Sequence, residues 1–300
     1  MARKLLFILN PLSGKAQIKN HLIEILDLFT KNGYEVTVHP TQCGGDARDV
    51  VAARGNEYDL VVCSGGDGTL DEVVTGVMQA GITAPIGYIP AGSTNDFAVS
   101  LHIPKTMKGA AQAIMDGRVY PCDIGRFNGR PFVYIAAFGL FTEVSYETPQ
   151  GIKNVLGHTA YLLEGVKRLT NIKAYSMHVV GDSIDIEDEF MYGMITNSTS
   201  VGGFKNITGK HVKLNDGLFE VTLIKQPKNP VGFQKIISAL LESSEKTEDM
   251  ICFKTSHLEI TSRESIAWTT DGEFGGRHSR VEICNEKRAL KIYVPAKKES

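Results

Sequence analysis

Strand-like and helix-like patterns alternate along the first part of the chain, and this alternation is the strongest constraint on its fold. We expect strands at residues 4–10, 35–41, 60–64 and 85–90, with helices between them at 17–31, 46–54 and 69–80. Such an alternation favours a doubly wound, mostly parallel sheet with helices on both faces. Ligands of these sheets bind beyond the carboxyl ends of the strands.

The pattern changes after Cys122, where short alternating runs separated by turn residues take over. We expect strands at residues 132–138, 175–180, 192–196, 218–225, 257–261, 280–284 and 290–294, and helices near 159–169 and 231–241. Such spacing is typical of an antiparallel β-sandwich or barrel. We therefore predict an α/β protein with a parallel-sheet domain at residues 1–124 and a C-terminal antiparallel β-sandwich domain at 125–300. Whether the last strand returns to the first domain is left open.

Composition and charge exclude several kinds of protein. A net charge of −2 offers no basic surface for nucleic acid, so we expect no such partner. No stretch approaches the ~20 apolar residues of a transmembrane helix. The five cysteines are odd in number and widely spaced, and the eight histidines show no metal-ligand spacing. We therefore expect reduced thiols, a cytoplasmic location and no zinc site.

The loop after the first predicted strand reads Asn10-Pro11-Leu12-Ser13-Gly14-Lys15. Its spacing is not that of a P-loop. Ser13 and Gly14 nevertheless lie just before a helix, where backbone N–H groups and the helix dipole attract phosphate. The alternative is a capping serine followed by a glycine turn.

The loop after the third predicted strand reads Gly65-Gly66-Asp67-Gly68-Thr69. Its three glycines allow a ligand to approach the backbone closely and allow successive N–H groups to face an anion. A carboxylate beside a phosphate needs an intervening cation, so Asp67 predicts Mg²⁺. The alternative, a turn in which Asp67 or Thr69 caps the next helix, does not explain all three glycines.

The loop after the fourth predicted strand, residues 90–98, again combines small hydroxylated residues with a carboxylate. Asn95 and Asp96 could simply cap a helix. Thr41, at the end of the second strand, carries a hydroxyl that could reach a ligand on the same edge. Three glycine-rich or capping loops on one edge of a parallel sheet together favour a phosphate-bearing ligand.

The elements NPLSGK, GGDGTLDEV and PAGSTNDFA make the chain resemble the diacylglycerol kinase catalytic domain, particularly the soluble bacterial lipid kinases. GGDGT is shared with NAD kinases and 6-phosphofructokinases, whereas the other two elements and the all-β second half point to lipid kinases. The resemblance implies ATP contacts from Asn10, Pro11, Leu12, Ser13, Gly14, Thr41, Gly65, Gly66, Asp67, Gly68, Thr69, Leu70, Asp71 and Thr94. The family usually has asparagine where this chain has Asp71.

The resemblance also implies two roles for magnesium and one for a base. Asp67, with Asp96 and Asp123 nearby, would organise the Mg²⁺ that accompanies ATP. Glu273, in the element Thr270-Asp271-Gly272-Glu273, would be the general base, and the catalytic set is thus Glu273, Asp67 and Asp96. A structural Mg²⁺ would be held by the Asp216 carboxylate and by the carbonyls of Lys213 and Leu218.

The resulting prediction is an ATP-dependent lipid kinase that converts diacylglycerol to phosphatidic acid. It would meet its lipid at the inner membrane surface and associate with that surface transiently. The residues do not distinguish diacylglycerol from a sphingoid base, phosphatidylglycerol or a polyprenol, because contacts with lipid chains leave no spaced polar motif. An NAD kinase, or a regulatory protein that binds nucleotide without catalysis, are the alternatives, and a homodimer is left open.

Overall fold

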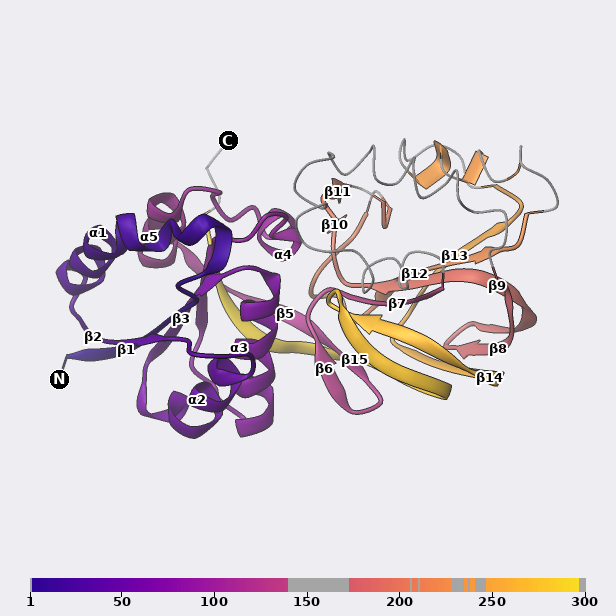
Figure 1. Cartoon of the computed structure of the whole chain (residues 1–300), viewed down its shortest axis with the longest axis horizontal. Helices are drawn as coiled ribbons and strands as arrows, with labels where there is room; N and C mark the ends of the chain where they lie inside the picture. Colours follow the sequence, from indigo (N-terminus) through magenta and orange to yellow (C-terminus); the bar gives the residue numbers. More distant parts are fainter. Residues whose placement is uncertain are drawn as a thin grey trace. The chain divides into compact units, whose positions relative to one another are not determined.

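A computed structural model describes residues 2–139, 173–205, 207–209, 211–227, 232, 235–236, 238–240 and 247–296. The protein is a mixed α/β chain (Figure 1). It divides into two compact units. The first contains Met1–Ile124, Leu214–Asp216 and Glu286–Ser300, and the second contains Gly125–Lys213 and Gly217–Asn285.

The first unit is built on a parallel sheet. Its strands are β1 (Arg3–Leu9), β2 (Tyr34–Pro40), β3 (Leu60–Gly65) and β4 (Ile86–Pro90), in the order β4-β3-β1-β2. The C-terminal part of β15 (Glu273–Val294) lies beside β4, with Ile292 paired to Ile86. Every residue of β3 and β4 is buried, as expected of parallel strands covered on both faces.

The helices of this unit pack in pairs. They are α1 (Ile18–Lys31), α2 (Asp46–Arg54), α3 (Asp67–Ala80), α4 (Asp96–Ser100) and α5 (Met107–Asp116), with short 3₁₀ turns at Ser13–Ala16 and Gly55–Glu57. α1 contacts α5 and α2 contacts α3, and Figure 1 shows the two pairs on opposite sides of the sheet. Apolar residues three and four apart give α1 its buried stripe. From this stripe Phe29 meets Phe7 of β1 edge to face, with ring centroids 5.8 Å apart.

The second unit is built from antiparallel strands. They are β5 (Arg118–Phe127, which begins in the first unit), β6 (Arg130–Phe132), β7 (Ile135–Gly139), β8 (Tyr175–Gly181), β9 (Ile184–Thr196), β12 (Phe219–Lys225), β13 (Met250–Thr255), β14 (His257–Thr270) and the N-terminal part of β15. A separate small hairpin joins β10 (Ser200–Val201) to β11 (Phe204–Lys205). Their order is β13-β12-β9-β7-β14-β15, with β5 between β15 and β6. β7 and β8 both pair with β9 and with β14, so they lie end to end in the same strand position of the sheet, between β9 and β14.

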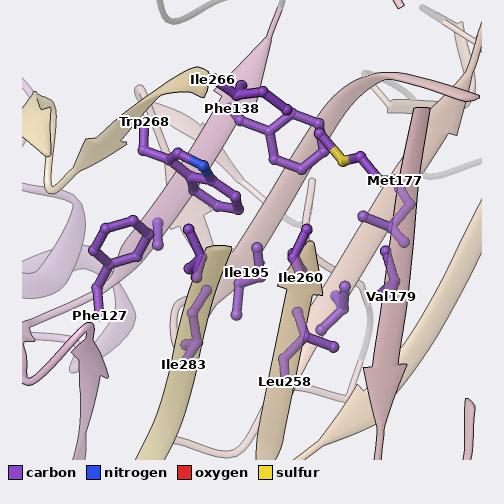
Figure 2. Close-up of a cluster of buried hydrophobic side chains, with 14 of the residues drawn as sticks. Phe127, Phe138, Met177, Val179, Ile195, Leu258, Ile260, Ile266, Trp268 and Ile283 are labelled. Atoms are coloured by element: carbon purple, nitrogen blue, oxygen red, sulfur yellow. The ribbon is translucent and has the colours of Figure 1, made fainter. Parts of the chain in front are cut away.

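Aromatic side chains fill the core of this unit. Trp268 of β14 lies between Phe127 and Phe138, at centroid distances of 5.2 Å and 4.8 Å (Figure 2). Phe132 of β6 stacks on Phe219 of β12, with centroids 5.7 Å apart. Several strands separate β6 from β12 in the hydrogen-bonding order. The sheet therefore curls until its distant strands share one apolar core.

Most strands and helices of the first unit lie where the sequence places them, but three other predictions were wrong. The single strand predicted at 132–138 is two strands, β6 and β7. The separate strands at 280–284 and 290–294 are parts of the continuous strand β15. The helix predicted from Thr69 begins at Asp67. α5 was not predicted, although its buried residues Met107, Ala110, Ala111 and Ile114 lie three and four apart, as on one face of a helix.

The structure tests only one of the two helices predicted in the second half of the chain. The predicted helix at 159–169 lies outside the described residues. Only parts of 231–241 are described; these are helical, and Ile236 and Leu240 among them are buried. No helix of the described chain has the length and apolar character needed to cross a bilayer.

Candidate functional site: a loop rim with two neighbouring carboxylates

The four parallel strands of the first unit end at the same level. Leu9 is in register with Pro40 and with Ser64, and Gly65 is in register with Pro90. The loops that follow therefore leave from one edge of the sheet. The chain moves from β1 outward to β2 and then crosses back to β3, so the strand order reverses between β1 and β3. Such a reversal opens a crevice at the carboxyl edge, where parallel sheets bind their ligands.

Asn10 organises the loop after β1. Its backbone N–H donates to the Ser64 carbonyl at 2.8 Å, and its Nδ2 donates to Thr69 Oγ1 at 3.3 Å. Its Oδ1 accepts the Leu12 N–H at 3.0 Å, which forms a local turn. This one side chain thus shapes its own loop and ties it to the start of α3.

Glycines allow the three loops to touch. A Cβ on Gly14 would lie 1.6 Å from the Ala91 carbonyl oxygen, and a Cβ on Gly92 would lie 2.7 Å from Gly66 Cα. A Cβ on Gly66 would lie 3.7 Å from Ser13 Oγ. The loops after β1, β3 and β4 therefore meet around Gly66. The structure thus brings together the three loops that the sequence predicts as phosphate-binding.

Gly66 is also the residue that precedes α3, and no side chain caps this end of the helix. The first N–H groups of an α-helix have no partner within the helix, and the dipole makes this end positive. Gly68 in the first turn is exposed. The rim therefore presents backbone donors of the kind that bind phosphate.

Two carboxylates lie beside these donors. Asp67 Oδ2 accepts the Thr94 hydroxyl at 3.1 Å and the Asp96 N–H at 3.3 Å, and Asp96 is itself buried. Burial, together with the negative charge of Asp96, raises the pKa of Asp67 to about 6, while the hydrogen bonds from Asp96, Thr94 and Phe97 oppose the shift. Among the described residues, Asp67 Oδ1 is buried without a hydrogen-bond partner.

This pair fits a hard cation. An ionised carboxylate oxygen buried without a partner is costly, and a neighbouring carboxylate adds to the cost. Oxygen ligands from carboxylates are those that Mg²⁺ prefers, and Mg²⁺ is commonly held by one or two of them together with phosphate oxygens. Asp67 and Asp96 are therefore suited to hold such an ion, and a bound cation would relieve the desolvation cost.

Asn95 and Tyr88 shape the loop after β4, and neither was predicted to belong to the site. Asn95 adopts a left-handed conformation with φ of 53°, which asparagine tolerates better than most residues. Its Oδ1 accepts the Gly92 N–H at 2.9 Å and its Nδ2 donates to the Gly92 carbonyl at 2.8 Å. The Tyr88 hydroxyl, buried in β4, bonds Asn95 Oδ1 and the Gly65 carbonyl, each at 3.2 Å. In the sequence, the signal for this role of Asn95 was an asparagine among small residues.

Glu72 is a further residue for which the sequence predicted no role. Its two carboxylate oxygens accept the N–H groups of Gly45 at 2.8 Å and Ala47 at 3.2 Å. It thereby supplies the cap that α2 lacks from its own sequence, because the residue that precedes α2 is Gly45. Glu72 fixes the loop that follows Thr41 against α3.

The remaining predicted ATP contacts take different positions. The Thr41 N–H donates to the Leu9 carbonyl at 2.9 Å, which places Thr41 on the same rim. Leu12 is 84% exposed, whereas Leu70 is buried in the core and its N–H donates to the Gly66 carbonyl. Thr69 is buried and packs against Gly65. Pro11 and Asp71 are half-buried.

The element around Glu273 belongs to the second unit. Asp271 is buried in a left-handed conformation with φ of 51°, and its carboxylate accepts the N–H groups of Val133, Tyr134 and Ile135. These three bonds bend the chain between β6 and β7, which is why the predicted single strand is interrupted. Glu273 follows at the exposed start of β15. Asp271 therefore sets the turn that presents Glu273.

The segment predicted to hold a structural metal crosses between the units. Leu214–Asp216 belongs to the first unit, whereas Lys213 and Leu218 belong to the second. In the first unit the Asp123 N–H donates to the Leu214 carbonyl at 2.8 Å, and Asp123 Oδ1 accepts the Arg288 N–H at 2.6 Å. Asp123 is thus engaged with this segment.

Tyr120 lies near both carboxylates of this region. Burial, followed by the charges of its neighbours, raises its pKa to about 12. Asp123 and Asp216 are among those neighbours. Acidic groups therefore gather at this point of the first unit.

Comparisons with known proteins agree with this geometry. Residues 4–127 match the model of the diacylglycerol kinase catalytic domain. A diacylglycerol kinase of Bacillus subtilis (strain 168) is 34% identical over 294 residues, which cover 97% of this chain and 96% of that protein. A diacylglycerol kinase of Staphylococcus aureus (strain MRSA252) is 34% identical over 298 residues, which cover 98% and 93% respectively.

Solved structures give the same result. The crystal structure of a candidate diacylglycerol kinase from Bacillus anthracis str. Sterne superposes with a TM-score of 0.86 at 25% identity, covering 98% of this chain and 95% of that one. A second diacylglycerol kinase structure from that strain has a TM-score of 0.78 at 22% identity and shows the shared fold, over 98% of this chain and 97% of the other. Full-length identity above 30% to several such enzymes establishes the assignment: this chain belongs to the diacylglycerol kinase family and is a kinase of that family.

Proposed function

We propose that this protein transfers the γ-phosphoryl group of ATP to the hydroxyl of a membrane lipid, with diacylglycerol as the acceptor and phosphatidic acid as the product. The curated relatives are named for this lipid. The observation that carries the proposal is the meeting of three loops around Gly66, beside the carboxylates of Asp67, at the start of α3, and of buried Asp96, at the start of α4.

The loop rim is proposed to bind the phosphates of ATP. N–H groups at the start of α3 and in the loops after β1 and β4 would donate to phosphate oxygens, and the helix dipole adds to the attraction. Gly66 matters most, because a hydrogen in place of a side chain lets phosphate reach the N–H groups that follow it. Exposed Leu12 offers an apolar surface to the rest of the nucleotide.

Asp67 and Asp96 are proposed to hold Mg²⁺. When bound, the ion would neutralise charge on the phosphates during transfer. The protein's own part is to keep Asp67 Oδ2 fixed by the Thr94 hydroxyl and the Asp96 N–H, so that Oδ1 faces the ion in a set direction. Fixed carboxylates of this kind need little rearrangement as the reaction proceeds.

Glu273 is proposed to act as the general base. Its carboxylate would accept the proton of the lipid hydroxyl as that oxygen bonds to the γ-phosphorus and the bond to ADP breaks. Its exposed position at the start of β15 suits a group that meets substrate. Asp271 is proposed to position it by holding the preceding turn in shape.

The remaining parts of the proposal concern architecture. The first unit would be a doubly wound nucleotide-binding domain and the second a β-sandwich that meets the lipid at the membrane surface. Asp216, with the carbonyls of Lys213 and Leu218, would bind a structural Mg²⁺. The protein would be cytoplasmic and associate only transiently with the membrane, and whether it forms a homodimer is left open.

The experiment is a radiolabelled ATP assay over lipid alcohols in mixed micelles, with NAD as a soluble control acceptor. We expect label in phosphatidic acid, dependence on Mg²⁺, and loss of transfer in Asp67→Asn. Label in a sphingoid base, phosphatidylglycerol or a polyprenol instead would reassign the acceptor. Label in NAD that is independent of micelles would show an NAD kinase and refute the proposal.

A further inference from the structure

His257, Glu282 and Cys284 come together on the outer face of the second unit, although they are separated in the sequence. Their ligand atoms (a ring nitrogen, a carboxylate oxygen and a thiol sulfur) all lie within 4.8 Å of one another. His257 and Cys284 are half-buried and Glu282 is exposed, so an ion could reach the three groups from solvent. None of these residues belongs to the sets proposed for ATP, Mg²⁺ or lipid.

Strand pairing explains why they converge. β14 and β15 are antiparallel, with His257 directly opposite Cys284. Glu282 lies two residues from Cys284 and therefore on the same face. The neighbours Leu258, Val281 and Ile283 point the other way, into the aromatic core. The sequence indicated no zinc site because sequence spacing alone does not reveal ligands that meet across two strands.

The distances suit a tetrahedral metal. Zn²⁺ binds nitrogen and oxygen at about 2.0–2.2 Å and sulfur at about 2.3 Å, so its ligand atoms are about 3.3–3.6 Å apart. Here His257 Nε2 lies 3.3 Å from Glu282 Oε1, and Cys284 Sγ lies 3.8 Å from the same oxygen. Only small side-chain movements would be needed to bring these atoms to the distances found between zinc ligands.

The backbone around the three ligands is firmly held. The Asp182 carboxylate accepts both the N–H of Ser256 at 2.5 Å and its hydroxyl at 2.9 Å, which anchors the residue before His257. Asn128 exchanges two bonds with Glu282: its Oδ1 accepts the Glu282 N–H at 2.9 Å, and its own N–H donates to the Glu282 carbonyl at 2.9 Å. Sites carried by fixed strands hold their ligands more accurately than sites on loops.

We propose that His257, Glu282 and Cys284 form a Zn²⁺ site that ties β14 to β15 and stabilises the second unit. Three protein ligands leave a fourth position for water. A thiolate and an imidazole favour zinc over magnesium, which prefers oxygen ligands alone. The Mg²⁺ proposed to accompany ATP and the Zn²⁺ proposed here can therefore be distinguished chemically. An experiment can refute either proposal without refuting the other.

The test uses the purified full-length chain, stripped of metal and titrated with Co²⁺ and then Zn²⁺. We expect one equivalent of Co²⁺ to give the strong visible bands of a tetrahedral ion and a thiolate charge-transfer band, both abolished by Zn²⁺ and unaffected by excess Mg²⁺. Cys284→Ser should remove the charge-transfer band, and His257→Gln should weaken binding about 100-fold or more, since even the loss of a group that only supports a ligand costs about 10–100-fold.

Two control variants separate this site from ordinary surface groups. Cys43→Ser removes an exposed thiol that lies outside the cluster. His178→Gln removes a histidine that is paired with Asp185 at 2.7 Å on the neighbouring strands but has no thiol in the pair. Both should bind the metal as the wild type does. Wild-type protein that binds Co²⁺ without a thiolate band, or whose melting temperature is unchanged by Zn²⁺, would overturn the proposal even if a variant failed to fold.

Discussion

Asp67→Asn should make the metal-free protein more stable at neutral and alkaline pH. Asp67 has a folded-state pKa of about 6, well above the ordinary value of 3.8, because burial and the Asp96 charge penalise its ionised form. A group with a raised pKa contributes stability below its unfolded pKa and loses that contribution as the pH rises through the folded value. A difference of about two pH units corresponds to about 3 kcal/mol.

The variant removes that loss while keeping the local shape. An asparagine carbonyl can accept the Thr94 hydroxyl and the Asp96 N–H, as Asp67 Oδ2 does. Its uncharged NH₂ group would replace Oδ1, which has no partner among the described residues, and would remove the repulsion between the Asp67 and Asp96 charges. We therefore expect Asp67→Asn to exceed the wild type by about 2–3 kcal/mol at pH 8, with the advantage shrinking between pH 7 and pH 4.

The assay is urea unfolding in EDTA at several pH values, followed by helical circular dichroism. Among the described residues this signal comes mainly from the first unit, because α1 to α5 belong to it. Fluorescence of Trp268, the single tryptophan, reports the second unit and should not distinguish the two proteins. A variant that is less stable than the wild type at pH 8, or an advantage independent of pH, would refute the reasoning from burial and charge.

Four further changes, with Gly92→Ala as the comparison for Gly66→Ala, test other parts of the site. Glu273→Gln should lower kcat by about 10²–10⁴-fold with unchanged ATP affinity, as measured by steady-state kinetics and nucleotide titration. Gly66→Ala should fold normally, because its Cβ would come no nearer than 3.4 Å to Gly92 Cα, but it should weaken ATP binding about tenfold or more. By contrast, Gly92→Ala should lower the melting temperature, because its Cβ would lie 2.7 Å from Gly66 Cα. Asp271→Ala should cost about 3 kcal/mol or more in urea unfolding, because three buried N–H groups lose their acceptor. Asp216→Ala should abolish any rise of melting temperature with Mg²⁺.

Each of these has a result that would count against it. Weakened ATP binding with normal kcat would remove Glu273 from the base role. An intact ATP affinity in the alanine variant of Gly66 would show that phosphate binds elsewhere. A normal melting curve for the Asp271 variant would mean that the turn holds without its carboxylate. A melting temperature of the wild type that is indifferent to Mg²⁺ would end the structural-metal proposal.

The sequence predicted the first unit well because its signals are local. The near-continuous apolar run of β1 indicates a buried strand. In the same way, the spacing of Ile18, Ile25 and Phe29 indicates the buried face of α1. The helix 46–54 was predicted with the bounds that α2 has. The loops were identified for the same reason: several glycines directly after a strand indicate a backbone that must be approached closely, and the register of β1 to β4 makes these loops neighbours.

The parts that were missed depend on contacts distant in sequence. Asp271 bends the chain at Val133, more than a hundred residues away in the sequence. No local pattern around Val133 indicates that the strand predicted there is interrupted. β15 runs through the polar stretch around Lys287, which reads as a turn because the partners of an extended strand are not visible in its own sequence. Glu72 looks like an ordinary surface carboxylate of α3 until the N–H groups of Gly45 and Ala47 are seen beside it.

The most direct measurement is calorimetric titration of the wild type and of Asp67→Asn with a non-hydrolysable ATP analogue, each with Mg²⁺ and with EDTA. If the rim around Gly66 and the Asp67–Asp96 pair bind nucleotide and metal together, the wild type will bind one equivalent tightly only when Mg²⁺ is present, and the variant will lose this dependence. Equal affinity in EDTA, or an unchanged response to Mg²⁺ in the variant, would contradict the proposed site.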